Sequence, residues 1–192
     1  ALQEEIGAGP ALFGAAADLA DPSAARAFLD EAASRLGTLD GLALTAGAWG
    51  GGTRFDAAAL DEWPSMLRTN LDTVANACRA ALPHLRKEGG SVVAVGSRAA
   101  EQGGAGMAAY AVSKVAVHAL VRVLALENAA AGVRFNAVLP GTIDTPANRR
   151  AMPDADRSKW ASLNRCRRRP GRRLPSIGSL RRVNDTRTRH DP

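Results

Sequence analysis

The sequence contains little cysteine and histidine, which argues against a disulfide framework and against a metal site. Its two cysteines stand apart, Cys78 in an apolar helical run and Cys166 among arginines, which gives neither a disulfide framework nor metal-ligand spacing. No two of the three histidines (His84, His118 and His190) have ligand spacing, so we predict no metal site. A chain without a disulfide framework fits a reducing cytoplasm.

Long apolar runs and a basic leader are also missing. Hydrophobic residues make up 46% of the chain, but no run approaches the ~18 residues that suggest a membrane span. The first six residues are acidic, where a secretory leader would be basic. We therefore expect a cytoplasmic, globular protein without membrane contact.

The net charge of +6 comes from one end of the chain. Residues 164–192 hold ten arginines and two aspartates, a net charge of +8, whereas residues 1–163 sum to −2. The basic pI therefore says nothing about the partners of the globular part. Because the tail lacks apolar periodicity and interleaved aromatics, we expect it to be disordered and without specific nucleic-acid binding.

The most informative stretch contains the only tyrosine of the chain. Tyr110 and Lys114, one of three lysines, lie four residues apart in an Ala-rich run, Ala108–Ala130, that we expect to be helical. Side chains at i and i+4 share one face of a helix. Because a nearby ammonium favours phenolate over phenol, we expect Tyr110 to act as a general acid/base.

Two short apolar strands flank this helix. The first ends at Ser97, thirteen residues before Tyr110, and the second runs from Val133 to a Pro140–Gly141 turn. A strand, a helix and a strand in this order predict a βαβ crossover with parallel neighbouring strands. Ligands of such sheets bind beyond the carboxyl ends of the strands, where Ser97 and the turn both fall.

At this point the sequence resembles a known family, the short-chain dehydrogenases/reductases, over roughly Pro10 to Trp160. The matching motifs are Asn70 in Thr-Asn-Leu, Ser97, Tyr110-x-x-x-Lys114, Asn136-Ala-Val-Leu-Pro-Gly141 and Thr142-x-x-Thr145. The resemblance implies an α/β, Rossmann-like, doubly wound parallel sheet in residues 1–160, followed by the arginine-rich tail of residues 161–192. The sheet would be incomplete, because the first βαβ unit and the last strand of the family are missing.

The resemblance also implies an activity and its residues. The site would transfer a hydride between NAD or NADP, which the sequence does not distinguish, and a small-molecule carbonyl or secondary alcohol. The catalytic residues would be Asn70, Ser97, Tyr110 and Lys114. The cofactor would contact Asp18, Leu19, Ala46, Gly47, Ala48, Tyr110, Lys114, Pro140, Gly141, Ile143 and Thr145. Family members commonly form homodimers or homotetramers through the helix of Tyr110 and its predecessor.

Two of these assignments have structural alternatives. Asp18 and Leu19 would follow a short strand, Ala11–Ala17, and would receive the adenine amino group, but this stretch also suits a helix cap before Pro22. Asn70 would hold a water that connects Lys114 with solvent, or it caps a helix segment.

Periodicity predicts the remaining elements. We expect a helix over Pro22–Leu36, a buried strand over Leu39–Thr45, and a helix over Leu60–Leu85 that is interrupted at Pro64 and bent near Asn70. The family's usual Asn-Asn-Ala-Gly is Leu-Thr-Ala-Gly here, so the small residues are kept and the amides are lost. His84 and His118 are expected to have structural roles.

The start of the chain departs from the family. Gly7-x-Gly9 is not a phosphate-binding turn, because it follows no strand and Pro10 interrupts it. We expect this chain to be a fragment of a reductase whose reading frame is shifted after about Trp160. The alternative function is a non-catalytic remnant that acts only in subunit pairing.

Overall fold

The computed structural model describes residues 13–162, and its centre is a parallel sheet of three strands. The strands are β1 (Gly41–Leu44), β2 (Gly90–Val95) and β3 (Val133–Val138), in the order β1-β2-β3. Their register pairs Leu44 with Ala94 and Val95 with Val138, so the carboxyl ends of all three strands lie together. The expected Rossmann-like α/β fold with an incomplete parallel sheet is confirmed.

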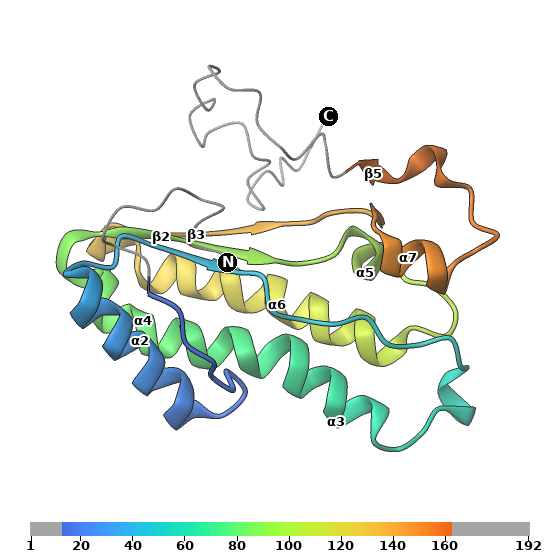
Figure 1. The fold of residues 1–192 in the computed structure, drawn as a ribbon, viewed down its shortest axis with the longest axis horizontal. Helices are drawn as coiled ribbons and strands as arrows, with labels where there is room; N and C mark the ends of the chain where they lie inside the picture. The colour runs from blue at the N-terminus through green and yellow to red at the C-terminus, as the bar shows by residue number, and fades with distance from the viewer. Residues whose placement is uncertain (1–12, 163–192) are drawn as a thin grey trace, which may run out of the picture.

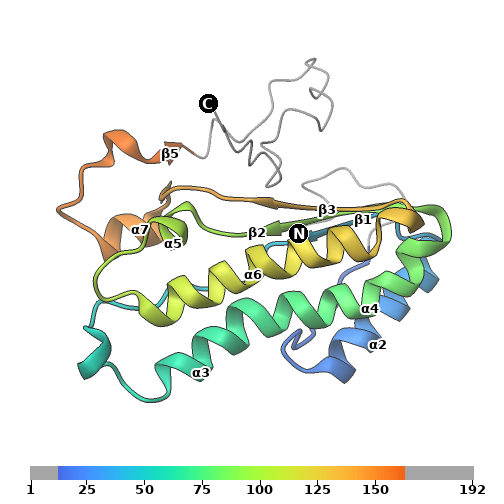
Figure 2. The same ribbon diagram turned by 180° about the vertical axis from the view of Figure 1, so that it is seen from behind.

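Three long helices cover one face of this sheet (Figures 1 and 2). They are α2 (Pro22–Leu36), α4 (Thr73–Glu88) and α6 (Ala108–Glu127). α2 has the bounds expected from the sequence, because Asp21 caps its first turn and Gly37, with a φ of +83°, ends it. The helices and the sheet enclose an apolar core whose fully buried members include Leu85, Val92, Val117 and Val133.

The helix expected over Leu60–Leu85 is divided into three parts. α3 (Glu62–Leu67) leads into a π-helical turn, η2 (Arg68–Asp72), and then into α4. The bend expected near Asn70 is this π turn. Pro64 interrupts nothing, because it lies in the first turn of α3, where no helical N–H is needed. A second proline, Pro83, lies inside α4.

The prediction of a strand over Ala11–Ala17 is wrong for residues 13–17, which are the part of this range that the structure describes. Residues 13–18 are irregular and do not join the sheet. Instead the Phe13 ring stacks on Phe28 at 5.9 Å, and the Arg35 guanidinium lies 4.8 Å from the same ring. A strand needs a neighbouring ladder to satisfy its backbone, and within residues 13–162 no strand pairs with the outer edge of β1.

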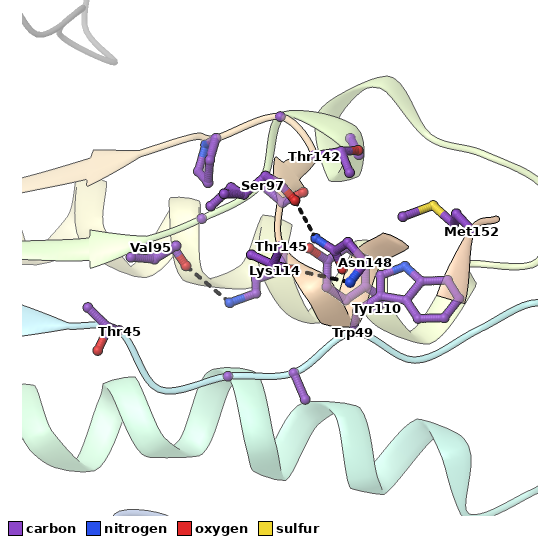
Figure 3. A pocket seen from close by; sticks show the side chains of 17 residues that line it. Thr45, Trp49, Val95, Ser97, Tyr110, Lys114, Thr142, Thr145, Asn148 and Met152 are labelled. Atoms are coloured by element: carbon purple, nitrogen blue, oxygen red, sulfur yellow. Dashed lines mark hydrogen bonds between the residues drawn. The ribbon is translucent and has the colours of Figure 1, made fainter. Parts of the chain in front are cut away.

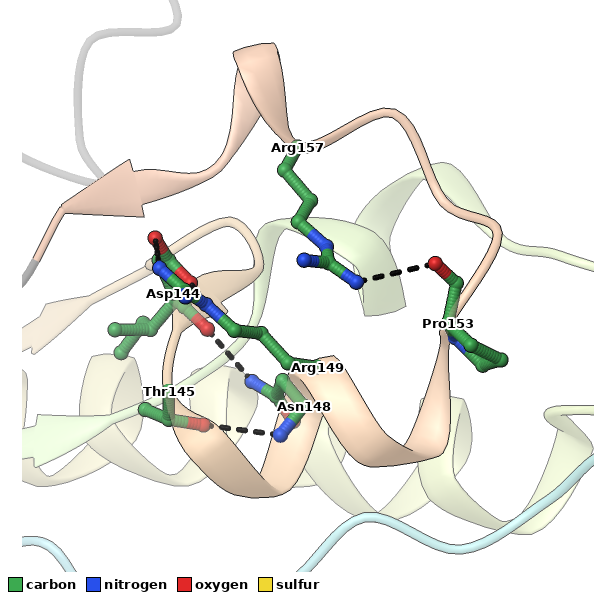
Figure 4. Close-up of polar contacts among 7 residues, drawn as sticks. Asp144, Thr145, Asn148, Arg149, Pro153 and Arg157 are labelled. Carbon is green, nitrogen blue, oxygen red and sulfur yellow. Dashed lines mark hydrogen bonds and ion pairs between the residues drawn. The ribbon is translucent and has the colours of Figure 1, made fainter.

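The segment after β3 forms a small flap beside the end of the sheet. It contains β4 (Ile143–Asp144), α7 (Pro146–Ala151), η4 (Arg157–Lys159) and β5 (Ala161–Ser162), and β4 pairs with β5. Figure 4 shows the polar contacts of this flap, including the two hydrogen bonds from the Arg149 guanidinium to the Asp144 carboxylate at 2.6 and 2.8 Å. These bonds hold the pKa of Asp144 below its usual value. The remaining short elements are η1 (Phe55–Ala57), α5 (Arg98–Gln102) and η3 (Ala129–Ala131).

α6 is the most apolar helix of the fold. By length and composition it would be able to cross a membrane, a criterion that core helices of soluble proteins also meet. Here α6 packs against β3 and α3, and its buried face includes the polar residues Ser113, Lys114 and His118.

The arginine-rich tail, for which we expect disorder and no specific nucleic-acid binding, lies outside the described residues.

Candidate active site

A pocket of about 420 Å³ opens at the carboxyl ends of the three strands (Figure 3). It lies where the strand order predicts a ligand site. Nine of the residues singled out from the sequence line it: Gly47, Ala48, Ser97, Tyr110, Lys114, Pro140, Gly141, Ile143 and Thr145. The fold thus brings together residues that are up to 98 positions apart in the chain.

Tyr110 and Lys114 enter this pocket from the first turns of α6. The Lys114 side chain is almost entirely buried, and its Nζ donates to the carbonyl oxygen of Val95 at 3.1 Å (Figure 3). Burial lowers the pKa of Lys114, because an ammonium loses hydration there. The partly exposed Tyr110 has the access to the pocket that a proton donor needs.

Asn70 lies behind the pocket and is fully buried. Its Oδ1 accepts from the backbone N–H of Ala48 at 2.9 Å, and its Nδ2 donates to the Ala48 carbonyl at 3.0 Å and to Ser113 Oγ at 3.0 Å. The Ser113 hydroxyl in turn donates to the Tyr110 carbonyl at 2.8 Å. The alternative of a helix cap is therefore wrong, because the Asn70 amide joins the loop after β1 to α6.

Gly47 is the point where this loop passes closest to α6. Its φ is +152°, and a Cβ placed on it would lie 2.7 Å from Asn70 Oδ1 and 2.8 Å from Lys114 Nζ. Only glycine fits this position without displacing one of those two groups. The neighbouring Ala46 does not line the pocket, whereas Ala48 does.

Ser97 lies two residues after the end of β2 and is the N-cap of α5. Its Oγ accepts from the backbone N–H of Ala100 at 3.2 Å, an N-cap bond, and its own N–H donates to His118 Nε2 at 3.1 Å. The side chain is 96% buried yet lies on the pocket wall. Its position therefore depends on both α5 and α6.

The loop after β3 supplies the opposite wall. Arg98 N donates to the Pro140 carbonyl at 3.2 Å, which ties this loop to the start of α5. Thr145 caps α7, because its Oγ1 accepts from Asn148 N at 3.1 Å. The Asn148 side chain donates to the Ile143 carbonyl at 2.8 Å, so the loop is fixed at both ends (Figure 4).

Asp18 and Leu19 lie outside the pocket. The Asp18 carboxylate accepts from Ala20 N at 2.9 Å and pairs with the Arg68 guanidinium at 2.6 Å. The Leu19 carbonyl accepts from the Asn76 side chain at 3.2 Å. The helix cap that this stretch also suited is confirmed, and it is Asp21, directly before Pro22. Asp18 and Leu19 themselves lie away from the pocket that holds the other predicted site residues.

Several residues of the site were not predicted. Trp49, Asn148 and Met152 line the pocket, and Ser113 and His118 support it from α6. The sequence carried a signal for the last two, because positions 113 and 118 share a helical face with Tyr110 and Lys114. Within the described residues 13–162, no three His, Cys, Asp or Glu side chains are grouped so that they could hold a metal ion.

Known proteins of one family are similar to this chain. The family profile described as "short chain dehydrogenase" matches residues 1–156. The 3beta-hydroxysteroid dehydrogenase of Mediterraneibacter gnavus is 31% identical over 137 residues, which are 71% of this chain and 50% of that protein. The chain spans about half the length of the curated relatives that it matches.

Solved structures share the fold. A gluconate 5-dehydrogenase from Burkholderia cenocepacia, in complex with NADP and tartrate, superimposes with a TM-score of 0.67 at 32% identity, covering 72% of this chain and 54% of that one. A xylitol dehydrogenase with bound NAD+ has a TM-score of 0.67 at 26% identity, covering 69% of this chain and 51% of that one. Both cofactors therefore occur among similar structures.

Proposed function

Because this chain belongs to the short-chain dehydrogenase family, we propose that it carries the catalytic half of an NAD- or NADP-dependent oxidoreductase. Its substrate is a small molecule with a carbonyl or secondary alcohol group. The observation that supports this proposal most directly is the presence of Ser97, Tyr110 and Lys114 in one pocket at the carboxyl ends of the strands.

The pocket suits a nicotinamide nucleotide. Gly47 lets the loop after β1 pass close to Asn70 and Lys114, and the loop lines the pocket with Gly47 and Ala48. Pro140, Gly141, Ile143 and Thr145 would hold the nicotinamide side of the cofactor, and Lys114 would bind its ribose hydroxyls. When bound, the cofactor donates or accepts the hydride, and the protein orients it. Asp18 and Leu19 lie outside this pocket, and we propose that they contact the adenine end of the cofactor rather than its nicotinamide.

Four side chains have separate roles in proton transfer and substrate binding. Tyr110 protonates the carbonyl oxygen in reduction and accepts the hydroxyl proton in oxidation. Lys114 lines the same pocket and contributes positive charge near the reacting oxygen. Ser97 donates a hydrogen bond to the substrate oxygen, because its hydroxyl hydrogen is free when Oγ accepts from Ala100. Asn70 positions the loop and α6 and completes the route by which Lys114 exchanges protons with solvent.

The test compares the 192-residue chain with its Tyr110→Phe variant. Fluorescence titration with NADH and NADPH measures cofactor binding, and loss of NAD(P)H absorbance with a ketone measures turnover. We expect Tyr110→Phe to keep cofactor binding and to lower turnover by a factor of at least about 100, the size of a typical acid/base contribution. Unchanged turnover in the variant would show that Tyr110 has no catalytic role.

A second function, subunit pairing without catalysis, is supported by the exposed apolar side chains of α6. Val112, Val115, Val123 and Leu126 are all more than 40% exposed. Such a protein would self-associate and leave both nucleotides unbound. The same titration separates the two functions, since binding of either nucleotide favours the enzyme.

A further inference from the structure

The backbone N–H of Ser97 has an unusual acceptor for the end of a buried strand. It donates to the ring Nε2 of His118, 21 residues away on α6, whereas the preceding N–H of Gly96 donates to the Val138 carbonyl of β3 at 2.9 Å. We propose that His118 is a positioning residue that fixes Ser97 in the site only while its ring is neutral. This proposal rests on the function proposed for Ser97 above.

The packing around the ring supports a dedicated contact. His118 is 7% exposed, and a Cβ on Gly96 would collide with the ring atoms Nε2 and Cδ2. The residue directly before Ser97 is thus a glycine at a position where a side chain would push the imidazole away. Since Ser97 Oγ also caps α5, movement of this turn would move both the hydroxyl and the helix.

The hydrogen bond determines the tautomer of the ring. Because Nε2 accepts the Ser97 N–H, the single proton of the neutral imidazole is on Nδ1. Nδ1 lies 3.5 Å from Glu101 Oε1 on α5, so the carboxylate favours this tautomer. A second proton on Nε2 would place two N–H groups against each other and break the bond to Ser97.

Two charged groups face the ring, and they act in opposite directions. Burial is the largest effect and lowers the pKa of His118 below its usual value, while Glu101 on α5 raises this pKa and Lys114 on α6 lowers it. The β2 side of the ring presents only the Gly96 and Ser97 backbone. The contact is therefore complete at neutral pH and is lost as the pH falls below the ordinary histidine range, which makes the position of Ser97 sensitive to acid.

Nuclear magnetic resonance on the 192-residue chain, labelled with ¹⁵N, tests this proposal without cofactor or substrate. At pH 7.5 we expect the Nε2 of His118 to show the ¹⁵N shift of an unprotonated acceptor, with the proton on Nδ1. As the pH is lowered, the Ser97 amide proton should move upfield with the same midpoint as the His118 ring. A protonated Nε2 at pH 7.5, or a Ser97 amide shift without pH dependence, would overturn the proposal.

Two variants separate positioning from simple folding. His118→Gln offers an amide oxygen that does not titrate, so the Ser97 amide should stay downfield and become independent of pH between 5 and 7.5. The matched control is His84→Gln, because His84 lies on α4 and its Nε2 contacts Asp30 of α2 at 2.7 Å. This variant should leave the Ser97 profile unchanged. A Ser97 titration that persists in His118→Gln would contradict the proposal. Since no readout requires turnover, failure of the proposed enzyme function gives a different pattern, namely no nucleotide binding with the His118 titration intact.

Discussion

Gly47 adopts a φ of +152° and leaves no room for a side chain between Asn70 and Lys114. We predict that Gly47→Ala lowers the free energy of unfolding by about 1–3 kcal/mol, the usual cost of a side chain in a sparsely populated backbone conformation. The displaced Lys114 should also weaken nucleotide binding. Urea unfolding measures the first effect, and fluorescence titration measures the second.

Two other glycines are matched controls for this substitution. Gly52 has a φ of +109° but open space around its Cβ position, so Gly52→Ala tests backbone strain alone. Gly14 is exposed, has neither constraint, and should tolerate alanine with a gain of about 0.5 kcal/mol. If Gly52→Ala weakened nucleotide binding as much as Gly47→Ala, crowding against Lys114 would not be the cause.

Cys78 is buried in α4, and burial raises the pKa of its thiol to about 12. Only the thiolate reacts with alkylating agents, so in a Cys166→Ser background we predict that iodoacetamide modifies the folded chain far more slowly than the urea-unfolded chain at pH 8. Because the thiol ionises more easily once unfolded, its contribution to stability falls as the pH rises from 9 towards 12. Equal rates for the folded and unfolded chains would contradict the buried position.

At the scale of elements, α4 contains a proline where a helix normally has a hydrogen bond. Pro83 is exposed and lies inside the helix, so the carbonyl of Arg79 lacks its usual N–H donor. We predict that Pro83→Ala raises the free energy of unfolding by about 1–2 kcal/mol, since the restored bond outweighs the added freedom of the unfolded chain.

Pro22 provides the control for this prediction. It occupies the first turn of α2, where proline is favoured. Pro22→Ala should therefore lower the free energy of unfolding by about 0.5 kcal/mol. Urea denaturation of both variants gives the comparison, and a loss of stability in Pro83→Ala would indicate that α4 depends on the shape of the ring.

The elements that local signals define were predictable from the sequence. The Asp21 cap, the Pro22 start and the Gly37 stop gave the bounds of α2, and apolar runs gave β2 and β3. The strand expected at Ala11–Ala17 failed because a strand depends on its neighbours, and no described strand lies beside it.

The site shows the same division between local and tertiary signals. Tyr110 and Lys114 were identified because four residues make one helical turn. The contacts of Asn70 with Ala48 and of Ser97 with His118 were not predicted, because they join segments that only the tertiary fold brings together. Trp49 and Met152 line the pocket from loops. Loops have no sequence periodicity from which their place in the pocket could be predicted.

At the scale of the whole molecule, α6 presents an apolar stripe away from the sheet. Val112, Val115, Ala119 and Val123 follow a spacing of three, four and four residues, and all are exposed. A stripe of this kind is typical of a helix that packs against a second helix. Since the helices α2, α4 and α6 all lie on one face of the sheet (Figure 2), the partner that we propose is α6 of a second copy.

We therefore predict that the 192-residue chain forms dimers, and that the double substitution Val115→Lys and Val123→Lys raises the dimer dissociation constant more than about tenfold. Burying each valine contributes about 1.5 kcal/mol or more, and 1.4 kcal/mol is a factor of ten in affinity. The control Leu60→Lys changes a side chain that is 97% exposed and outside the stripe. Sedimentation equilibrium measures both variants. A monomer at all concentrations, or an equal effect of Leu60→Lys, would exclude α6 as the contact, whereas a selective effect would place Tyr110 and Lys114 on a helix whose opposite face is the subunit interface.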